Sequence, residues 1–379
     1  MKDVLGTEDA RFTLPRPAWL TRWSRWCQSS RGPGAFRGLP RPIRLIAGAA
    51  ACVLGLGVLT VVQGQTPTPT PTPTLVVAAA GLERLRADGA VDPVLLPAGQ
   101  DPARLLRLAH ATVVLTRPPN LAFGGWAFLL PDGSTQLRRL GPADQLAPDS
   151  RGDRVWLVRG ASVRSLEAYD GSGRHIESRS ARSEHDLLLV TPGGVVDDEV
   201  VNPGGTTPTL RSDSGQVLRR WGGPVQVLDV VGPRLLVVTG SCLDGCTVQV
   251  WDVRLGMSDP VSAPLDGGLV VLDGALSPDG RSVALAARSA SAGATMDGPD
   301  GQAVLLRGHL DVGAVGGEPW STVVDGGCTL LACHVAWSGD TVYASTDLTP
   351  GGFIRWDASG RVERLSLRVP AVVDLASAR

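Results

Sequence analysis

Short apolar runs separated by turn-forming residues follow one another along the chain from residue 75 to its end. The clearest unit contains the runs VQVLDVV (225–231), RLLVVTG (234–240) and TVQVWDV (247–253). The first two are almost continuously apolar, whereas the third alternates apolar with polar positions, and such short runs bounded by turns are typical of strands. We therefore predict three consecutive strands here and a fourth near 261–265.

A turn containing Asp, usually followed closely by Gly, recurs through the same part of the chain. The recurring aspartates are Asp88, Asp132, Asp170, Asp213, Asp252, Asp311 and Asp357. Their spacings are 44, 38, 43, 39, 59 and 46 residues, and the long spacing becomes 45 without the 14 residues of a loop-like insertion at 288–301. A period near 40–45 residues with several strands per repeat is typical of a β-propeller.

The sequence thus predicts an all-β propeller of seven blades, preceded by one transmembrane α-helix. Six blades are the alternative, because the repeats near 103–145 and 187–222 are irregular. A pair of β-sandwiches is the other fold that remains open.

The two ends of the repeat region complement each other. TLVVAAA (74–80) has the pattern of a second strand without a first, and PAVVDLASA (370–378) has no later strands to pair with. We expect the C-terminal strand to complete the first sheet, which closes a ring and removes open sheet edges.

Three segments give the repeat a resemblance to a known class of proteins. ALSPDGRSVALAA (275–287) places Ser-Pro-Asp-Gly between two apolar strands, and both VQVWD (248–252) and FIRWD (353–357) end in Trp-Asp. These residues resemble the repeats of bacterial TolB-like and WD40-like propellers, which are extracytoplasmic. The resemblance implies a propeller over residues 75–379, and it implies no single activity.

Residues 45–62, LIAGAAACVLGLGVLTVV, form an uncharged apolar run. As a helix this run would be about 27 Å long, close to the hydrocarbon thickness of a bilayer. Arginines flank it on the N-terminal side, so the positive-inside rule places residues 1–44 in the cytoplasm and the propeller outside it. We predict a single transmembrane helix; a cleaved signal peptide and a buried core helix are the alternatives.

The apolar run is followed by QGQTPTPTPTPT (63–74). Each Pro fixes its own φ and biases the preceding Thr toward extended angles. The segment therefore predicts a polyproline II stalk, about 28 Å long over residues 66–74 at about 3.1 Å per residue. Such a stalk would hold the propeller away from the membrane surface.

Charge is divided unevenly along the chain. Residues 1–44 carry nine Lys and Arg against three Asp and Glu, a net charge of +6, and the remaining residues carry 27 against 34, a net charge of −7. The split suggests two environments, and the acidic propeller disfavours nucleic-acid binding.

The basic tail contains Trp19, Trp23 and Trp26 on one face of a helix, with Arg22 and Arg25 beside that face. Basic amphipathic helices with Trp suit the membrane interface. The alternatives are a disordered tail with incidental Trp and a docking peptide for a cytoplasmic partner.

Four of the six cysteines form two close pairs in the predicted exported domain. The pairs are Cys242 with Cys246 and Cys328 with Cys333. Disulfides persist outside the cytoplasm, and loops this short bring two Cα atoms within bonding range. We predict two local disulfides, with a four-cysteine zinc site as the alternative. Cys27 and Cys52 are expected to be free thiols.

Motifs for catalysis and for cofactor binding are missing from the sequence. The five His have no partners at metal-ligand spacing, no Gly-x-Ser-x-Gly occurs, and Lys2 is the only lysine, which excludes a Walker A loop from the propeller. Asp197, Asp198 and Glu199 could touch calcium, but acidic runs of this kind are usually solvated turns. The Asp of the repeated turns are expected to be structural. We therefore predict no catalytic residue, no cofactor and no bound metal.

A large repeat surface without a catalytic constellation favours a non-catalytic binding or scaffold module, anchored in the cell membrane. Its ligand, a protein or another envelope component, would contact a propeller face. One alternative is a propeller enzyme, a hydrolase or lyase, with its site in the central channel. Another is a transmembrane signalling protein whose N-terminal tail recruits a cytoplasmic partner.

The predicted topology can be tested by maleimide mass-tagging of the denatured protein taken from cells. Because four of the six cysteines should be oxidised, we expect two tags without reductant and six with it. Six tags before reduction would mean that the propeller cysteines are reduced, in a cytoplasmic or a metal-bound propeller, and would contradict the predicted topology.

Overall fold

The computed structural model describes residues within the second of the two units into which the chain divides, Pro71–Arg379. The described ranges are 75–78, 81–86, 89–119, 124–201, 205–223, 225–240, 246–254, 257–261, 269–289, 303–309, 321–325, 334–346, 352–366 and 374–376. The predicted tail with Trp19, Trp23 and Trp26, the apolar run at 45–62 and the stalk at 63–74 lie outside these residues. In the described ranges no helix is long and apolar enough to cross a membrane.

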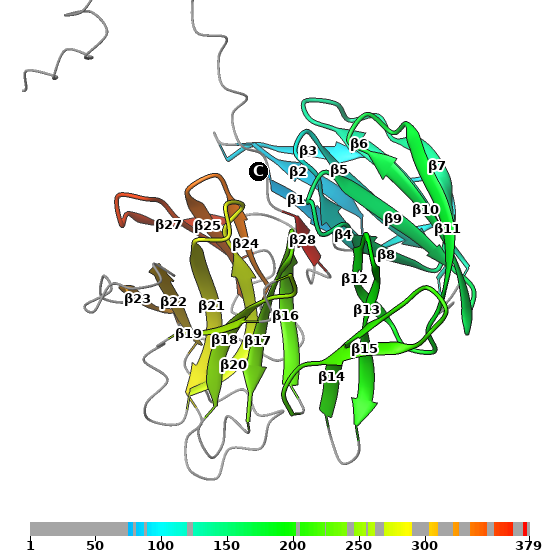
Figure 1. Cartoon of the computed structure of the whole chain (residues 1–379). Helices are drawn as coiled ribbons and strands as arrows, with labels where there is room; N and C mark the ends of the chain where they lie inside the picture. The colour runs from blue at the N-terminus through cyan, green and yellow to red at the C-terminus, as the bar shows by residue number, and fades with distance from the viewer. Residues whose placement is uncertain are drawn as a thin grey trace, which may run out of the picture. The chain divides into compact units, whose positions relative to one another are not determined.

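Every regular element in these ranges is a β-strand, and the strands form antiparallel sheets in chain order (Figure 1). Five sheets have four strands each. Written from the inner to the outer strand, they are β28(Asp374–Ala376)-β1(Leu75–Ala78)-β2(Leu82–Leu85)-β3(Val91–Val94), β4(Asp101–Arg107)-β5(Ala111–Arg117)-β6(Gly125–Pro131)-β7(Arg138–Ala143), β8(Gln145–Pro148)-β9(Arg154–Arg159)-β10(Val163–Asp170)-β11(His175–Arg182), β20(Leu269–Leu276)-β21(Ser282–Ser289)-β22(Ala303–His309)-β23(Ser321–Asp325) and β24(Val335–Ser338)-β25(Thr341–Thr346)-β26(Gly352–Trp356)-β27(Val362–Ser366).

The remaining sheet has eight strands and consists of two consecutive meanders. They are β12(Leu187–Thr191)-β13(Gly194–Val201)-β14(Gly205–Arg211)-β15(Val217–Arg220) and β16(Val225–Val231)-β17(Arg234–Thr239)-β18(Thr247–Asp252)-β19(Met257–Val261). The pair Thr206–Val225 joins β14 to β16. We call each four-stranded sheet and each of these meanders a unit.

The strands β4, β8, β12, β16, β20, β24 and β28 are the inner strands of their units. Neighbours in this series contact one another, except that β12 and β16 are linked through the pairing of β14 with β16. Antiparallel four-stranded units around a common axis define a β-propeller. The strand β28 pairs with β1 through Val76–Ala376 and Ala78–Asp374, so the C-terminal strand completes the first sheet. The expected ring closure is confirmed.

The second strands are continuously apolar because both of their faces are buried. Along β17, Leu235 and Val237 pack toward β12–β15, whereas Leu236 and Val238 pack toward β20–β23. Successive strand residues point to opposite faces, so a strand between two neighbours needs apolar residues at every position. This arrangement explains the run RLLVVTG that the sequence presents at 234–240.

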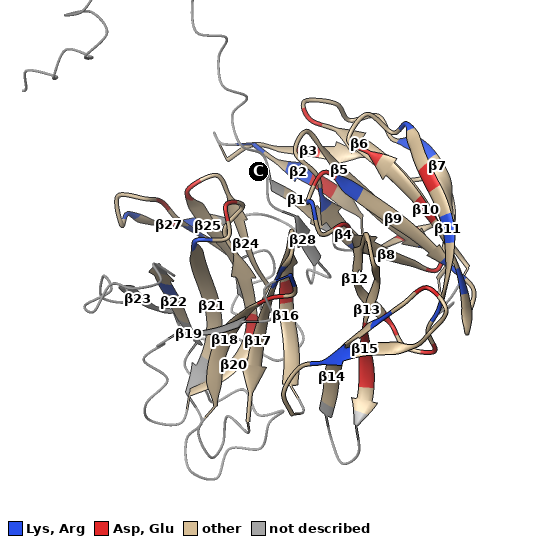
Figure 2. Cartoon of the chain, viewed as in Figure 1, with Lys and Arg blue, Asp and Glu red and all other residues tan. Residues whose placement is uncertain are grey.

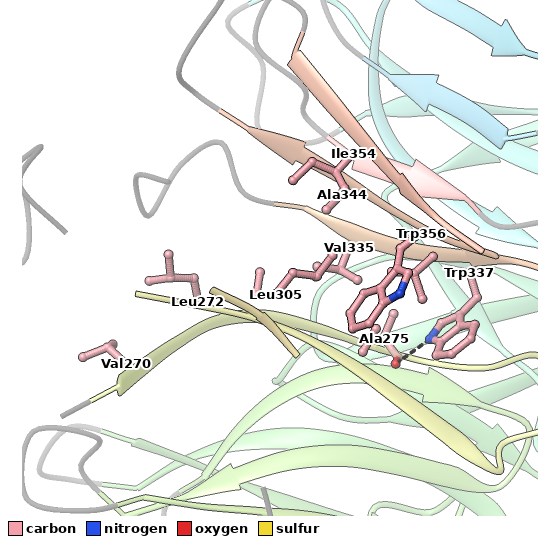
Figure 3. Close-up of a cluster of buried hydrophobic side chains, with 12 residues drawn as sticks. Val270, Leu272, Ala275, Leu305, Val335, Trp337, Ala344, Ile354 and Trp356 are labelled. Carbon is pink, nitrogen blue, oxygen red and sulfur yellow. Dashed lines mark hydrogen bonds between the residues drawn. The ribbon is translucent and has the colours of Figure 1, made fainter. Parts of the chain in front are cut away.

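Each hydrophobic cluster lies between two consecutive units. Figure 3 shows the cluster between β20–β22 and β24–β26, in which Trp337 and Trp356 pack with aliphatic side chains. The Trp337 Nε1–H donates to the carbonyl of Ala275 at 3.0 Å, so the indole's polar atom is satisfied within the apolar contact. Another cluster joins Val77 and Leu85 to Tyr343 and Phe353, and thereby packs the first unit against the last.

The predicted strands at 225–231, 234–240 and 247–253 correspond to β16, β17 and β18. The fourth strand, β19, begins at Met257, four residues before the expected position. Its sequence MSDPV lacks a clear alternation, which explains why the pattern placed it poorly.

Among the repeated aspartates within the described residues, Asp170 and Asp357 close turns between strands, as expected. The Asp170 carboxylate accepts hydrogen bonds from the Ser172 hydroxyl at 2.6 Å and from the backbone N–H groups of Ser172 and Arg174 at 3.0 Å each. These bonds lower the pKa of Asp170 to about 2. Asp357 makes the same three contacts with Ser359 and Arg361.

Deleting residues 374–379 should destabilise the propeller, because the deletion removes β28 and leaves β1 with an open edge. The three residue pairs lost correspond to about 3 kcal/mol of unfolding free energy at about 1 kcal/mol per hydrogen bond. Chemical denaturation should be compared with that of a control lacking only residues 377–379. Equal unfolding midpoints for the two truncations would contradict closure by β28.

Candidate functional site

A cavity of about 230 Å³ lies among the inner strands. Its described lining comes from six units, through residues of β4, β8, β12, β16, β20 and β24 and the neighbouring His334. It is therefore the central channel of the propeller, the place where loops and strands of separate repeats meet.

The inner strands carry a repeated irregularity. In β4, β12, β16 and β20 the register with the second strand shifts, which leaves one residue of the inner strand as a bulge. Bulges re-aim the side chains that follow them. The residue directly after the bulge is Arg104 in β4, Leu189 in β12, Asp229 in β16 and Asp273 in β20. Three of these positions are charged, and those three line the cavity.

The two aspartates connect consecutive units. One Asp229 carboxylate oxygen, Oδ2, accepts the backbone N–H of Leu276 in β20 at 2.8 Å, and Oδ1 accepts the N–H of Val230 at 2.7 Å. One unit further, Asp273 Oδ2 accepts the backbone N–H of Val335 in β24 at 2.9 Å. The tripeptide Val-Leu-Asp occurs at both 227–229 and 271–273. In both copies the aspartate accepts a backbone N–H from the next unit.

His334 lies beside the second of these carboxylates. Its Nδ1 is 3.6 Å from Asp273 Oδ2, and both side chains are about a quarter exposed. The pair is the one imidazole–carboxylate contact in the described cavity wall.

The two arginines of the cavity wall differ. Arg107 is buried, and its two terminal nitrogens donate to the two carboxylate oxygens of Asp132 at 2.6 Å each. Such a bidentate pair holds the guanidinium in place. Arg104 is exposed, and within the described residues its guanidinium makes no hydrogen bond or ion pair. Arg104 is therefore the arginine of the cavity wall whose guanidinium has no partner among the described residues.

The acidic run at 197–199 interacts mainly with arginines of the same chain. On β13, Asp197 accepts Arg211 Nε at 2.7 Å and Glu199 accepts Arg211 Nη2 at 2.7 Å, and Arg220 also pairs with Glu199 at 2.6 Å. The intervening Asp198 points to the other face, where burial raises the pKa of its carboxyl above the ordinary value. The described ranges contain no group of three or more His, Cys, Asp or Glu side chains that could hold a metal ion.

Charged side chains are otherwise concentrated on outer strands. Figure 2 shows charged side chains on the outer strands β7, β11 and β15, with the second strand β13 as an exception, whereas β17 and β21 are largely uncharged. The propeller thus separates a mixed-charge outer surface from an apolar interior with a few charges at its axis.

Of the cysteines, only Cys246 falls in the described ranges, and it is disulfide-bonded. Cys242, Cys328 and Cys333 lie outside those ranges, so both predicted pairings stay predictions.

Comparison with known proteins gives the fold and no family. No protein-family model and no curated protein matches the sequence. A structure from a study of two prolyl endopeptidases matches with 11% identity and a TM-score of 0.50, covering 78% of this chain and 50% of that one. The β-propeller domain of Cps50 (Swd1) from Myceliophteria thermophila matches with 12% identity and a TM-score of 0.46, covering 74% and 91%. TolB from Acinetobacter baumannii matches with 14% identity and a TM-score of 0.43, covering 80% and 81%.

The predicted resemblance to TolB-like and WD40-like propellers is confirmed at the level of the fold. At these identities the likeness extends to the fold alone.

Sequence reasoning missed Arg104, Asp229 and Asp273 as a group. Each follows a bulge, and a bulge leaves no mark in the hydrophobic pattern. The repeated Val-Leu-Asp, 44 residues apart, was the signal for the two aspartates.

Replacing Asp229 by Ala should lower the free energy of unfolding by about 1–3 kcal/mol, because the N–H of Leu276 would lose its acceptor. Asp229→Asn keeps one acceptor oxygen and should recover part of the loss. Asp340→Ala, which removes an exposed carboxylate, serves as the control and should change stability by less than about 0.5 kcal/mol. An equal effect of Asp229→Ala and Asp340→Ala in urea unfolding would show that the contact between units is unimportant.

Proposed function

We propose that the chain is a seven-bladed propeller, anchored in the cell membrane by a helix at 45–62, that acts outside the cytoplasm as a non-catalytic binding or scaffold module. Its ligand would be a protein or another envelope component that contacts a propeller face. The N-terminus would remain in the cytoplasm.

The sheet order supports the blade count. Five four-stranded sheets and two meanders of the eight-stranded sheet make seven units, and the two meanders meet through Thr206 and Val225. A hydrophobic cluster, built from residues such as Leu189 and Val237, lies between these two meanders as between other neighbours. This packing supports counting the two meanders as separate blades.

Location outside the cytoplasm is supported by sequence and by one structural observation. The apolar run, its arginine flank and the Thr-Pro stalk favour an exported domain. Cys246 is disulfide-bonded, and disulfides are rare in the cytosol of most organisms.

The proposed binding role rests on one observation: the carboxylates that line the channel already accept hydrogen bonds from the protein backbone. Asp229 and Asp273 accept backbone N–H groups of the next blade, so they hold blades together. A general base has to reach the proton that it abstracts, and backbone donors hold both oxygens of Asp229 and one oxygen of Asp273, which disfavours that task.

A propeller enzyme with its site in the channel is the second candidate. It is favoured by the contact between His334 and Asp273, since a carboxylate beside an imidazole can orient the ring for proton transfer. The matched prolyl endopeptidase structure is an enzyme, but this chain covers only half of its length.

The binding role can be tested by site-specific photo-crosslinking of the full chain in cells. A benzophenone amino acid would be placed at the exposed positions Leu95, Val163 and Leu218, which lie on three different blades. We expect at least one position to give an adduct of discrete mass, because a scaffold holds its partner on one face.

The same crosslinking should be repeated with His334→Ala, and samples without irradiation give the background. A binding module keeps its adduct in this variant. Absence of an adduct at all three positions, or its loss in His334→Ala, would count against the proposal and favour chemistry in the channel.

A further inference from the structure

The charged residues of the channel lie on opposite sides of the ring. In blade order, Arg104 belongs to the second blade, Asp229 to the fifth and Asp273 to the sixth. In a closed ring of seven, the second blade faces the boundary between the fifth and the sixth. One wall of the cavity therefore carries an unpaired guanidinium, and the opposite wall carries two carboxylates.

Asp229 accepts hydrogen bonds through both of its carboxylate oxygens, and Asp273 Oδ2 lies 3.6 Å from His334 Nδ1, but Arg104 and Asp273 Oδ1 have no partner among the described residues. Within the described residues Arg104 makes no ion pair. Asp273 accepts through Oδ2, and Oδ1 accepts no hydrogen bond from any described residue. Charged groups in a narrow, partly apolar space are unfavourable without partners, and such a space focuses their fields onto whatever enters.

We propose that this cavity binds a small zwitterion, an amino-acid-sized molecule with one anionic and one cationic group. Its carboxylate would pair with Arg104, and its ammonium group would pair with Asp273 beside Asp229. The proposal rests on the seven-blade ring but not on the partner-binding role of the outer faces.

The size and lining of the cavity agree with this ligand class. A volume of about 230 Å³ corresponds to about seven or eight waters at about 30 Å³ each, below the usual range for drug-sized ligands. Leu106, Leu188, Val227 and Leu228 contribute apolar surface around the charges. An aliphatic body with a charge at each end matches that distribution.

Singly charged ligands fit less well. A simple anion that pairs with Arg104 would also face two carboxylates, and a simple cation that pairs with Asp273 would also face the guanidinium. Like charges close to one another cost free energy, so the site discriminates against both.

The experiment is calorimetric titration of the purified full-length chain with L-leucine, 4-aminobutyrate and 6-aminohexanoate. These probes differ in the separation of their two charges. Each is compared with the carboxylic acid that lacks its amine and with the amine that lacks its carboxylate. We expect at least one zwitterion to bind about tenfold more tightly than both of its analogues.

Two variants test which protein side chain pairs with each charged group of the ligand. Arg104→Gln should weaken zwitterion binding at least about tenfold and remove the discrimination against the amine analogue. Asp273→Asn should weaken binding to a similar extent and remove the discrimination against the acid analogue, while its remaining amide oxygen still accepts Val335 N–H. Arg361→Gln, an exposed arginine of the turn between β26 and β27, is the matched control and should leave affinity unchanged.

The proposal is overturned if no probe binds below about 10 mM, if the analogues bind as tightly as the zwitterions, or if Arg104→Gln binds like the unaltered chain. Because the Arg104 guanidinium makes no hydrogen bond or ion pair within the described residues, its replacement should leave folding intact. The crosslinking positions lie on the outside of the propeller, so this site and the partner-binding face can each fail without the other.

Discussion

Burial of apolar side chains between neighbouring sheets is the interaction on which the rest of this structure depends. Each sheet has two apolar faces, and adjacent residues such as Val76 and Val77 of β1 pack against different neighbours. A sheet of this kind cannot be stable alone, because one face or the other would meet water. A closed ring leaves neither face exposed, and the cluster that contains Val77 and Phe353 packs the first unit against the last.

Apolar contact has no preferred direction, so other interactions must fix how the sheets sit against each other. Arginines do so across several boundaries by donating to a backbone carbonyl in the next unit. Arg84 donates to Pro131 at 2.8 Å, Arg307 to Asp357 at 3.0 Å, and Arg234 to Gly280. The long aliphatic stem of arginine packs against the apolar face, while the planar head reaches a turn at its edge. This use explains part of the arginine content of a chain that has one lysine.

The fold could be predicted from sequence because its determinants are periodic. The repeated Asp turns, the continuous apolar runs and the unmatched strands at the two ends all follow from one repeated unit. The turn at 277–280 shows the reason: Ser277 and Asp279 both accept the N–H of Arg281, so the local sequence Ser-Pro-Asp-Gly fixes this turn. The position of β19 was poorly predicted because an outer strand is buried on less of its surface, and its pattern is weaker.

The channel could not be predicted in the same way, because its charges depend on single-residue bulges. Without the extra residue at 228, the positions that follow on β16 would exchange faces, and Asp229 would no longer meet the N–H of Leu276. In β4 the residue at the equivalent position is Arg104, and its guanidinium makes no hydrogen bond or ion pair within the described residues. Among the four inner strands that carry the bulge, this position therefore holds an arginine, a leucine and two aspartates. The apolar contacts between neighbouring sheets tolerate this variation, and the two aspartates add a polar contact with the next sheet.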